Sequence, residues 1–106
     1  MTEKIKSQEE LLRIIAALKQ QGKKIVAYNG SFDLLHAGHA EVLAKAKAMG
    51  DVLVVLVNTD ISVRQYKGPC RPIIGERDRT ELVAALTVVD YVTLFDELTP
   101  KKLLGE

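Results

Sequence analysis

Residues 52–57 read VLVVLV, six apolar side chains in succession. Neighbouring side chains on a strand point to opposite faces, so a sheet with one solvated face would alternate polar and apolar residues. An unbroken apolar run of this length is typical of a strand covered on both faces, and parallel sheets flanked by helices provide that environment. The run therefore predicts a buried parallel strand at the centre of the fold.

The flanking segments alternate between helical and strand patterns. Ser7 and Glu10 have the spacing of a capping box, and apolar residues then recur at helical spacing, which predicts a helix over 8–21. Further along we expect strands over 24–28 and 91–95, helices over 38–50, 61–66 and 76–87, and a last helix opened by Thr99 and Pro100. Periodicity places the following residues in the core: Val42, Leu43, Ala46, Met49, Leu82, Val83 and Leu86.

This order of elements predicts an α/β protein. Short parallel strands joined by right-handed helical crossovers give a Rossmann-like three-layer α/β/α sandwich with a small parallel sheet. A length of 106 residues suits a single domain over 1–106. In such sheets ligands bind beyond the carboxyl ends of the strands, which directs the search for a site to the loops there.

Composition argues against several classes of function. Fifteen basic and fourteen acidic residues leave a net charge of +1, which favours neither nucleic-acid nor membrane binding. The apolar run at 52–57 is too short to span a bilayer. A single cysteine, Cys70, cannot form an internal disulfide and fits a reducing compartment. We therefore expect a cytoplasmic protein whose partners are neither nucleic acids nor membranes.

Both histidines of the chain, His36 and His39, follow the first expected strand, in NGSFDLLHAGH at 29–39. Gly38 permits close approach to the backbone, and the first amides of a helix favour an anion. Two imidazoles would add donors, so this segment predicts a phosphate pocket. Three other interpretations stay open. The histidines could have structural roles, bind zinc with Cys70 as the only further suitable ligand, or serve a hydrolase, although no G-x-S-x-G turn is present.

Residues 30–39, GSFDLLHAGH, resemble the signature of the nucleotidyltransferase superfamily with an H-x-G-H motif. A second stretch, VNTDISVRQYKGPCRPI at 57–73, resembles the bacterial heptose-1-phosphate adenylyltransferases, which occur as a free domain or fused to a sugar kinase. Glycerol-phosphate cytidylyltransferases share the histidine motif but match the K-G-x-x-R-P stretch less well. The resemblance runs from about residue 7 to residue 106.

The resemblance implies transfer of AMP from ATP to a sugar 1-phosphate, with release of pyrophosphate and with Mg²⁺ held mainly by phosphate oxygens. It implies catalytic roles for His36, His39 and Lys67, and phosphate contacts from Lys67 and Arg71. Arg79 would grip the β and γ phosphates. The nucleotide would be bound by Asn29, Gly30, Ser31, Phe32, Asp33, Gly38, Asn58, Asp60 and Arg79.

Several of these residues have simpler alternatives. Lys67, Arg71 and Arg79 also fit a solvated basic surface, and Phe32 also fits the core. Asp33 is a plausible turn former and Asp60 a plausible helix cap, so the metal ligands stay unassigned.

Compared with the family, we expect a C-terminally shortened domain, because residues 1–106 do not include the further strand and the Ser/Thr-rich motif that the resemblance implies. We expect the edge beside Tyr91–Phe95 to be unpaired, which favours either a homodimer or a marginally stable fold, and we expect catalysis to be weakened. One alternative function is a CTP-dependent glycerol- or polyol-phosphate cytidylyltransferase. The other is a non-catalytic nucleotide-binding module that regulates a partner such as a sugar kinase.

Overall fold

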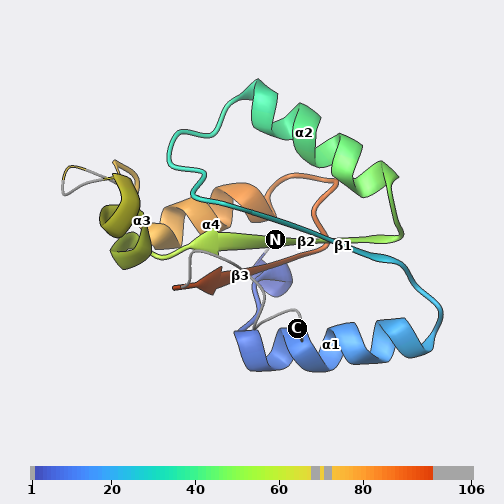
Figure 1. Ribbon diagram of the computed structural model, residues 1–106. Coiled ribbons are helices and arrows are strands. Elements are labelled where there is room, and N and C mark those ends of the chain that lie inside the picture. Colours follow the sequence, from blue (N-terminus) through green and yellow to red (C-terminus); the bar gives the residue numbers. More distant parts are fainter. Residues whose placement is uncertain (1, 68–69, 71–72, 97–106) are drawn as a thin grey trace.

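Three parallel strands form one sheet between two layers of helices (Figure 1). The computed structural model describes residues 2–67, 70 and 73–96. Its elements are η1 (Thr2–Lys4), α1 (Gln8–Gln20), β1 (Ile25–Gly30), α2 (Ala37–Ala48), β2 (Val52–Asn58), α3 (Asp60–Lys67), α4 (Glu76–Ala84) and β3 (Tyr91–Phe95). The strand order is β1-β2-β3, with α1 on one face and α2 and α4 on the other. The predicted three-layer sandwich is confirmed; the helix expected at residues 99–100 lies outside the described residues.

β2 is the central strand and contributes to two separate cores. Leu53, Val55 and Val57 pack with buried residues of α2 and α4. Val54 and Leu56 point to the other face, where they pack with buried residues of α1. All five side chains are fully buried. Helices cover both faces of β2, which is the environment that the unbroken apolar run predicts.

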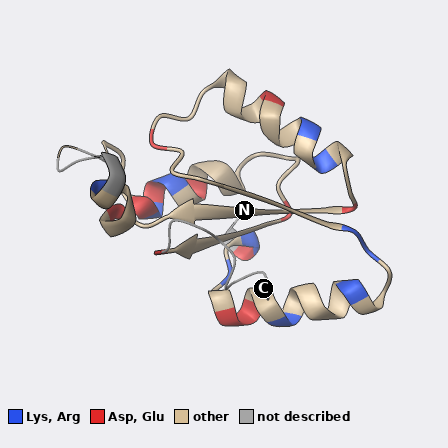
Figure 2. Ribbon diagram, viewed as in Figure 1, with Lys and Arg blue, Asp and Glu red and all other residues tan. Residues whose placement is uncertain are grey.

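Charged residues lie on the helices and loops around this apolar centre (Figure 2). None of the three strands contains Lys, Arg, Asp or Glu within its bounds. Any ionic chemistry must therefore take place at the ends of the strands and not along them.

Three residues expected in the core are exposed. Val42 is 42% exposed, Met49 65% and Leu82 43%, whereas their neighbours Leu43 and Val83 are fully buried. The sheet covers a narrower arc of α2 and α4 than the apolar pattern indicates. Helical spacing shows which residues share a face, but the width of the covered arc depends on what packs against it.

The expectation of an unpaired edge at β3 is wrong. Ile5 forms a parallel bridge with Val92, and the backbone N–H of Lys6 donates to the Val92 carbonyl at 2.9 Å. The amide side chain of Gln8 then donates to the Leu94 carbonyl, also at 2.9 Å. The segment before α1 thus bonds to part of the edge that was expected to attract a second copy, which removes that argument for a homodimer. No helix among the described residues is long and apolar enough to cross a membrane.

Two adjacent leucines of α1 test the packing on its face of the sheet. Leu11 is fully buried and Leu12 is 43% exposed. We expect Leu11→Ala to lower the free energy of unfolding by about 2–5 kcal/mol, because it removes buried apolar contacts and leaves a cavity. Leu12→Ala is the matched control and should cost less than about 1 kcal/mol. Urea unfolding followed by circular dichroism measures both, and equal losses would contradict this assignment of faces.

Candidate functional site

The carboxyl ends of the strands gather several of the predicted site residues. Gly30 pairs with Val57, and Asn58 pairs with Phe95, so the loops after β1, β2 and β3 begin at the same edge of the sheet. In Figure 1 the strand arrows point toward this edge, where α3 and the start of α4 lie. The placement agrees with the general position of ligand sites in α/β sheets.

The two histidines form a reciprocal cap at the start of α2. His36 is the N-cap residue, and its Nδ1 accepts a hydrogen bond from the Gly38 N–H at 3.0 Å. His39, at the N3 position, accepts at its Nδ1 from the His36 N–H at 3.1 Å. This is the capping-box arrangement, with imidazoles where Ser or Thr and Glu or Gln usually stand. The spacing H-x-G-H is therefore the N-cap to N3 spacing of the helix.

The cap also determines the proton positions on a neutral ring. A ring nitrogen that accepts a hydrogen bond carries no proton, so a neutral imidazole bonded in this way has its N–H at Nε2. The ring centroids lie 4.1 Å apart, with His36 exposed and His39 half-buried. The structural interpretation of the histidines is thus confirmed for Nδ1. The same bonds orient both rings relative to the start of α2.

Gly38 is required by the approach of the His36 ring. A Cβ atom at this position would lie 2.7 Å from His36 Cε1 and 3.0 Å from Nδ1, which is too close for either atom. The prediction that a group approaches the backbone here is therefore confirmed. The first amides of the helix were expected to favour an anion; the Gly38 amide donates to His36 instead of pointing outward without a partner.

Ser31, Phe32 and Asp33 are each held by a different part of the protein. The Ser31 carbonyl accepts from Arg79 Nη1 at 2.6 Å. The Phe32 ring is buried between Tyr28 and His39, with centroid distances of 6.3 and 5.4 Å. Phe32 has φ 53°, a left-handed conformation that is costly for a bulky residue and is kept only where its surroundings enforce it. Phe32 therefore belongs to the core and also supports His39.

Asp33 joins this loop to the one before α4. Its Oδ1 accepts from the N–H groups of Ile73 and Ile74 at 2.8 and 2.9 Å, and its Oδ2 lies 3.0 Å from the Ile73 nitrogen. Asp33 as a whole residue is 5% exposed. It therefore acts across 40 residues of sequence and is more than a local turn former.

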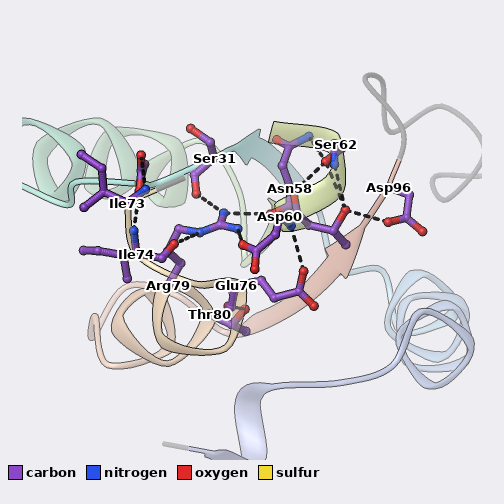
Figure 3. A network of polar contacts seen from close by, with 12 residues as sticks. Ser31, Asn58, Asp60, Ser62, Ile73, Ile74, Glu76, Arg79, Thr80 and Asp96 are labelled. Atoms are coloured by element: carbon purple, nitrogen blue, oxygen red, sulfur yellow. Dashed lines mark hydrogen bonds and ion pairs between the residues drawn. The ribbon is translucent and has the colours of Figure 1, made fainter. Parts of the chain in front are cut away.

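Arg79 is fully buried at the centre of a polar network (Figure 3). Its Nε donates to the Ile74 carbonyl at 2.8 Å, and its Nη1 donates to the carbonyls of Ser31 and Asn58. Its Nη2 forms an ion pair with Asp60 Oδ1 at 2.7 Å. A grip on the terminal phosphates requires an exposed guanidinium, and the structure instead buries it on protein acceptors. Neither this expectation nor a solvated surface role agrees with that placement.

Asp60 does not cap α3; the residue before it does. The Thr59 hydroxyl accepts from the Ser62 N–H, and the Thr59 carbonyl accepts from the Val63 N–H. The Asp60 carboxylate is directed to Arg79, while its own N–H donates to Glu76 Oε1 at 2.8 Å. The cap prediction failed because adjacent Thr and Asp are both good capping residues, and Arg79 selects the carboxylate.

Sequence reasoning missed several residues of this edge. The Thr59 hydroxyl donates to Asp96 after β3 at 2.6 Å, the Asn58 amide donates to the Ser62 hydroxyl, and Glu76 bonds to the start of α3. The spacing N-T-D-x-S after a buried strand was the available signal, because Thr59 is a small polar residue at the N-cap of α3 and Ser62 is one in its first turn. No sequence signal linked Glu76 or Asp96 to this loop.

The other predicted residues are either exposed or lie partly or wholly outside the described residues. Asn29 is an exposed residue of β1, and Lys67 is the last residue of α3, with its side chain outside the described part. Arg71 also lies outside the described residues. Cys70 is exposed. Among the described residues, no group of three or more His, Cys, Asp or Glu side chains could hold a metal ion, so the zinc interpretation has no ligand set there.

Comparison with known proteins identifies the family. The family model for cytidylyltransferase-like proteins matches residues 27–106, and the chain belongs to this family of nucleotidyltransferases. It is 52% identical over 102 residues to the bifunctional protein HldE of Pelobacter propionicus and 54% identical over 101 residues to that of Geobacter metallireducens. These alignments cover 96% and 95% of this chain but 21% of each relative, so the chain spans about a fifth of their length.

A solved structure supports the same fold. The lipopolysaccharide core biosynthesis protein from Thermoplasma volcanium is 38% identical to this chain and superimposes with a TM-score of 0.69. The match covers 78% of this chain and 66% of that one. The resemblance found in the H-x-G-H segment is therefore confirmed at the level of family and fold.

Substitution of Gly38 tests the reciprocal cap. We expect Gly38→Ala to displace the His36 ring and to cost about 1 kcal/mol of unfolding free energy, the usual value of a lost N-cap. Nitrogen-15 NMR of the imidazoles would report the loss of the hydrogen bond to Nδ1. Gly75→Ala is the control for the His36 signals, because a Cβ there meets nothing closer than Asp60 Oδ2 at 4.0 Å. Unchanged His36 signals in Gly38→Ala would refute the cap.

Proposed function

We propose that this domain transfers AMP from ATP to a sugar 1-phosphate, a heptose 1-phosphate by resemblance, and releases pyrophosphate. The observation that carries the proposal is the reciprocal histidine cap, which brings the two rings within 4.1 Å of each other at the carboxyl edge of the sheet. Membership of the cytidylyltransferase-like family supports the reaction class. The match of residues 57–73 to heptose-phosphate adenylyltransferases supports ATP and the sugar phosphate as substrates.

In this reaction an oxygen of the sugar phosphate attacks the α-phosphorus in line, and the bond from that phosphorus to the pyrophosphate oxygen breaks. The protein forms no covalent intermediate, so its contribution is to position the reactants and stabilise negative charge. His36 and His39 would donate from Nε2 to phosphate oxygens, with Nδ1 of each ring held by the backbone. Lys67 and Arg71 would supply positive charge to the phosphates.

Mg²⁺ would accompany ATP and screen its charge. Asp33 and Asp60 are poor candidates for direct ligands, because Asp33 accepts from two backbone N–H groups and Asp60 Oδ1 pairs with Arg79. We therefore propose that phosphate oxygens and water provide most of the coordination, as is usual for this ion.

Two alternatives differ from this proposal in specific ways. The family description supports a CTP-dependent cytidylyltransferase. Glycerol phosphate or another polyol phosphate would be its acceptor by resemblance in the histidine motif. A non-catalytic nucleotide-binding module remains the second alternative. Relatives named bifunctional, of which this domain would form about a fifth, support an association with a second activity such as a sugar kinase.

Nucleotide preference separates these alternatives. We expect pyrophosphate release with ATP and a heptose 1-phosphate to exceed release with CTP and glycerol 3-phosphate by at least about tenfold, a difference of about 1.4 kcal/mol in transition-state binding. A coupled pyrophosphate assay measures both reactions. Preference for CTP would favour the cytidylyltransferase. Binding of ATP without pyrophosphate release across the substrate panel would favour the non-catalytic module.

Capping and catalysis can be separated by substitution at the two histidines. Asn is among the best N-cap residues, and Gln at N3 completes a capping box. His36→Asn and His39→Gln should therefore keep α2 capped while removing the Nε2 donors. We expect each to change unfolding free energy by less than about 1 kcal/mol and to lower kcat by about 10²-fold or more.

The matched alanine variants distinguish the two roles. His36→Ala and His39→Ala should lose turnover to the same extent, and His36→Ala should also lose the stability of the cap. If His36→Asn or His39→Gln retains kcat within twofold of the parent, that histidine does not contact the reacting phosphates. If all four variants are active, the proposed transition-state role of the pair is wrong.

A further inference from the structure

Arg79 is a cation with no solvent-exposed surface, and its role follows from where its acceptors lie. They are Ile74, five residues before it, and Asp60, Asn58 and Ser31, which precede it by 19, 21 and 48 residues. These acceptors belong to three segments: the loop after β1, the junction of β2 and α3, and the turn before α4. One side chain thus joins the three segments that form the carboxyl edge of the sheet (Figure 3).

Asp33 reinforces the same connection with the opposite charge. It lies in the loop after β1 and accepts from the backbone N–H groups of Ile73 and Ile74. Arg79 follows that turn on α4 and donates to the carbonyls of Ile74 and Ser31. Two side chains therefore connect the loop after β1 to the turn before α4. Asp33 comes from the loop and bonds to the turn, and Arg79 on α4 bonds to both.

The connection continues from Ser31 to the histidines through packed contacts. Ser31 precedes Phe32, whose backbone is left-handed and whose ring lies 5.4 Å from the His39 ring. His39 in turn accepts from the His36 N–H. A shift of the Ser31 carbonyl would move Phe32 and, with it, the ring that it supports. The path is a contiguous set of bonds and packed rings, and such a set can carry coupling between two parts of a protein.

We propose that Arg79 is a positioning residue of the nucleotidyl-transfer site. It sets the place of the loop after β1, and through Phe32 the orientation of His39, without touching the triphosphate. The predicted effect of Arg79 on turnover rests on the proposed function. The predicted effect of Arg79 on the positions of the histidine rings does not, because it concerns the protein without nucleotide. Lys cannot replace Arg here, because a single ammonium group cannot reproduce the planar fork that serves four acceptors.

The test compares Arg79→Lys with Arg77→Lys on the same helix. Arg77 is the matched control, since its side chain is 90% exposed. Its substitution affects a 4.0 Å ion pair between Arg77 Nε and Glu81 Oε1 on the helix surface. The first readout is nitrogen-15 NMR of the His36 and His39 rings without nucleotide, with urea unfolding to follow the fold. The second is pyrophosphate release with ATP and a heptose 1-phosphate.

We expect Arg79→Lys to shift the ring signals and to lower kcat by about 10²-fold, the effect of a misplacement of about 1 Å at a reacting centre. The KM for ATP should stay within about threefold of the parent value, because no substrate contact is removed. Arg77→Lys should change none of these quantities. Unchanged ring signals in a folded Arg79→Lys protein would overturn the proposal. So would a raised KM with an unchanged kcat, which indicates a phosphate ligand.

Asp60→Ala decides the case if Arg79→Lys does not fold. It removes one acceptor, whose side chain is 30% exposed, and leaves the three carbonyl acceptors of Arg79 in place. Shifted ring signals relative to the exposed control Asp78→Ala would support the coupling, and unchanged signals would refute it. If the parent chain neither binds ATP nor releases pyrophosphate, the proposed function fails. The ring signals of the nucleotide-free protein still decide the positioning role.

Discussion

The burial of one guanidinium group is the constraint on which the site depends. Removing a charge from water costs several kcal/mol unless hydrogen bonds and an opposite charge replace the solvent. Arg79 meets this requirement with three carbonyls and the Asp60 carboxylate. Within the described residues every buried polar side-chain atom has a hydrogen-bond partner. If the loops that carry these acceptors moved apart, the buried guanidinium would lose its hydrogen-bond partners at a cost of several kcal/mol. The loops are therefore held in place relative to the sheet.

The histidine motif caps α2 with the same two side chains to which the proposed reaction assigns phosphate contacts. Its spacing is that of a capping box, so the Nδ1 atoms satisfy backbone donors that a helix start would otherwise leave unpaired. The same bonds orient the rings and place the proton of a neutral ring on Nε2. Gly38 is part of this arrangement, because only the absence of a side chain leaves room for the His36 ring.

The fold was predicted well wherever the pattern depended on the chain's immediate neighbours. β2 was identified from its unbroken apolar run, and the cap of α1 from Ser7 and Glu10. Val42 and Met49 were placed wrongly, because periodicity indicates a face but not the width of what covers it. The edge at β3 was also predicted wrongly, since no local pattern shows that Lys6 bonds to Val92.

The sequence by itself determined the class of the sheet, the family to which the chain belongs and the position of the candidate site after β1. Each of these depends on a pattern of residues that are close together along the chain, either the run at 52–57 or the segment 29–39. Only the tertiary structure decided what Asp33, Asp60 and Arg79 do. Their partners lie between 5 and 48 residues away, and a charged side chain takes its role from the acceptors and donors that folding brings to it.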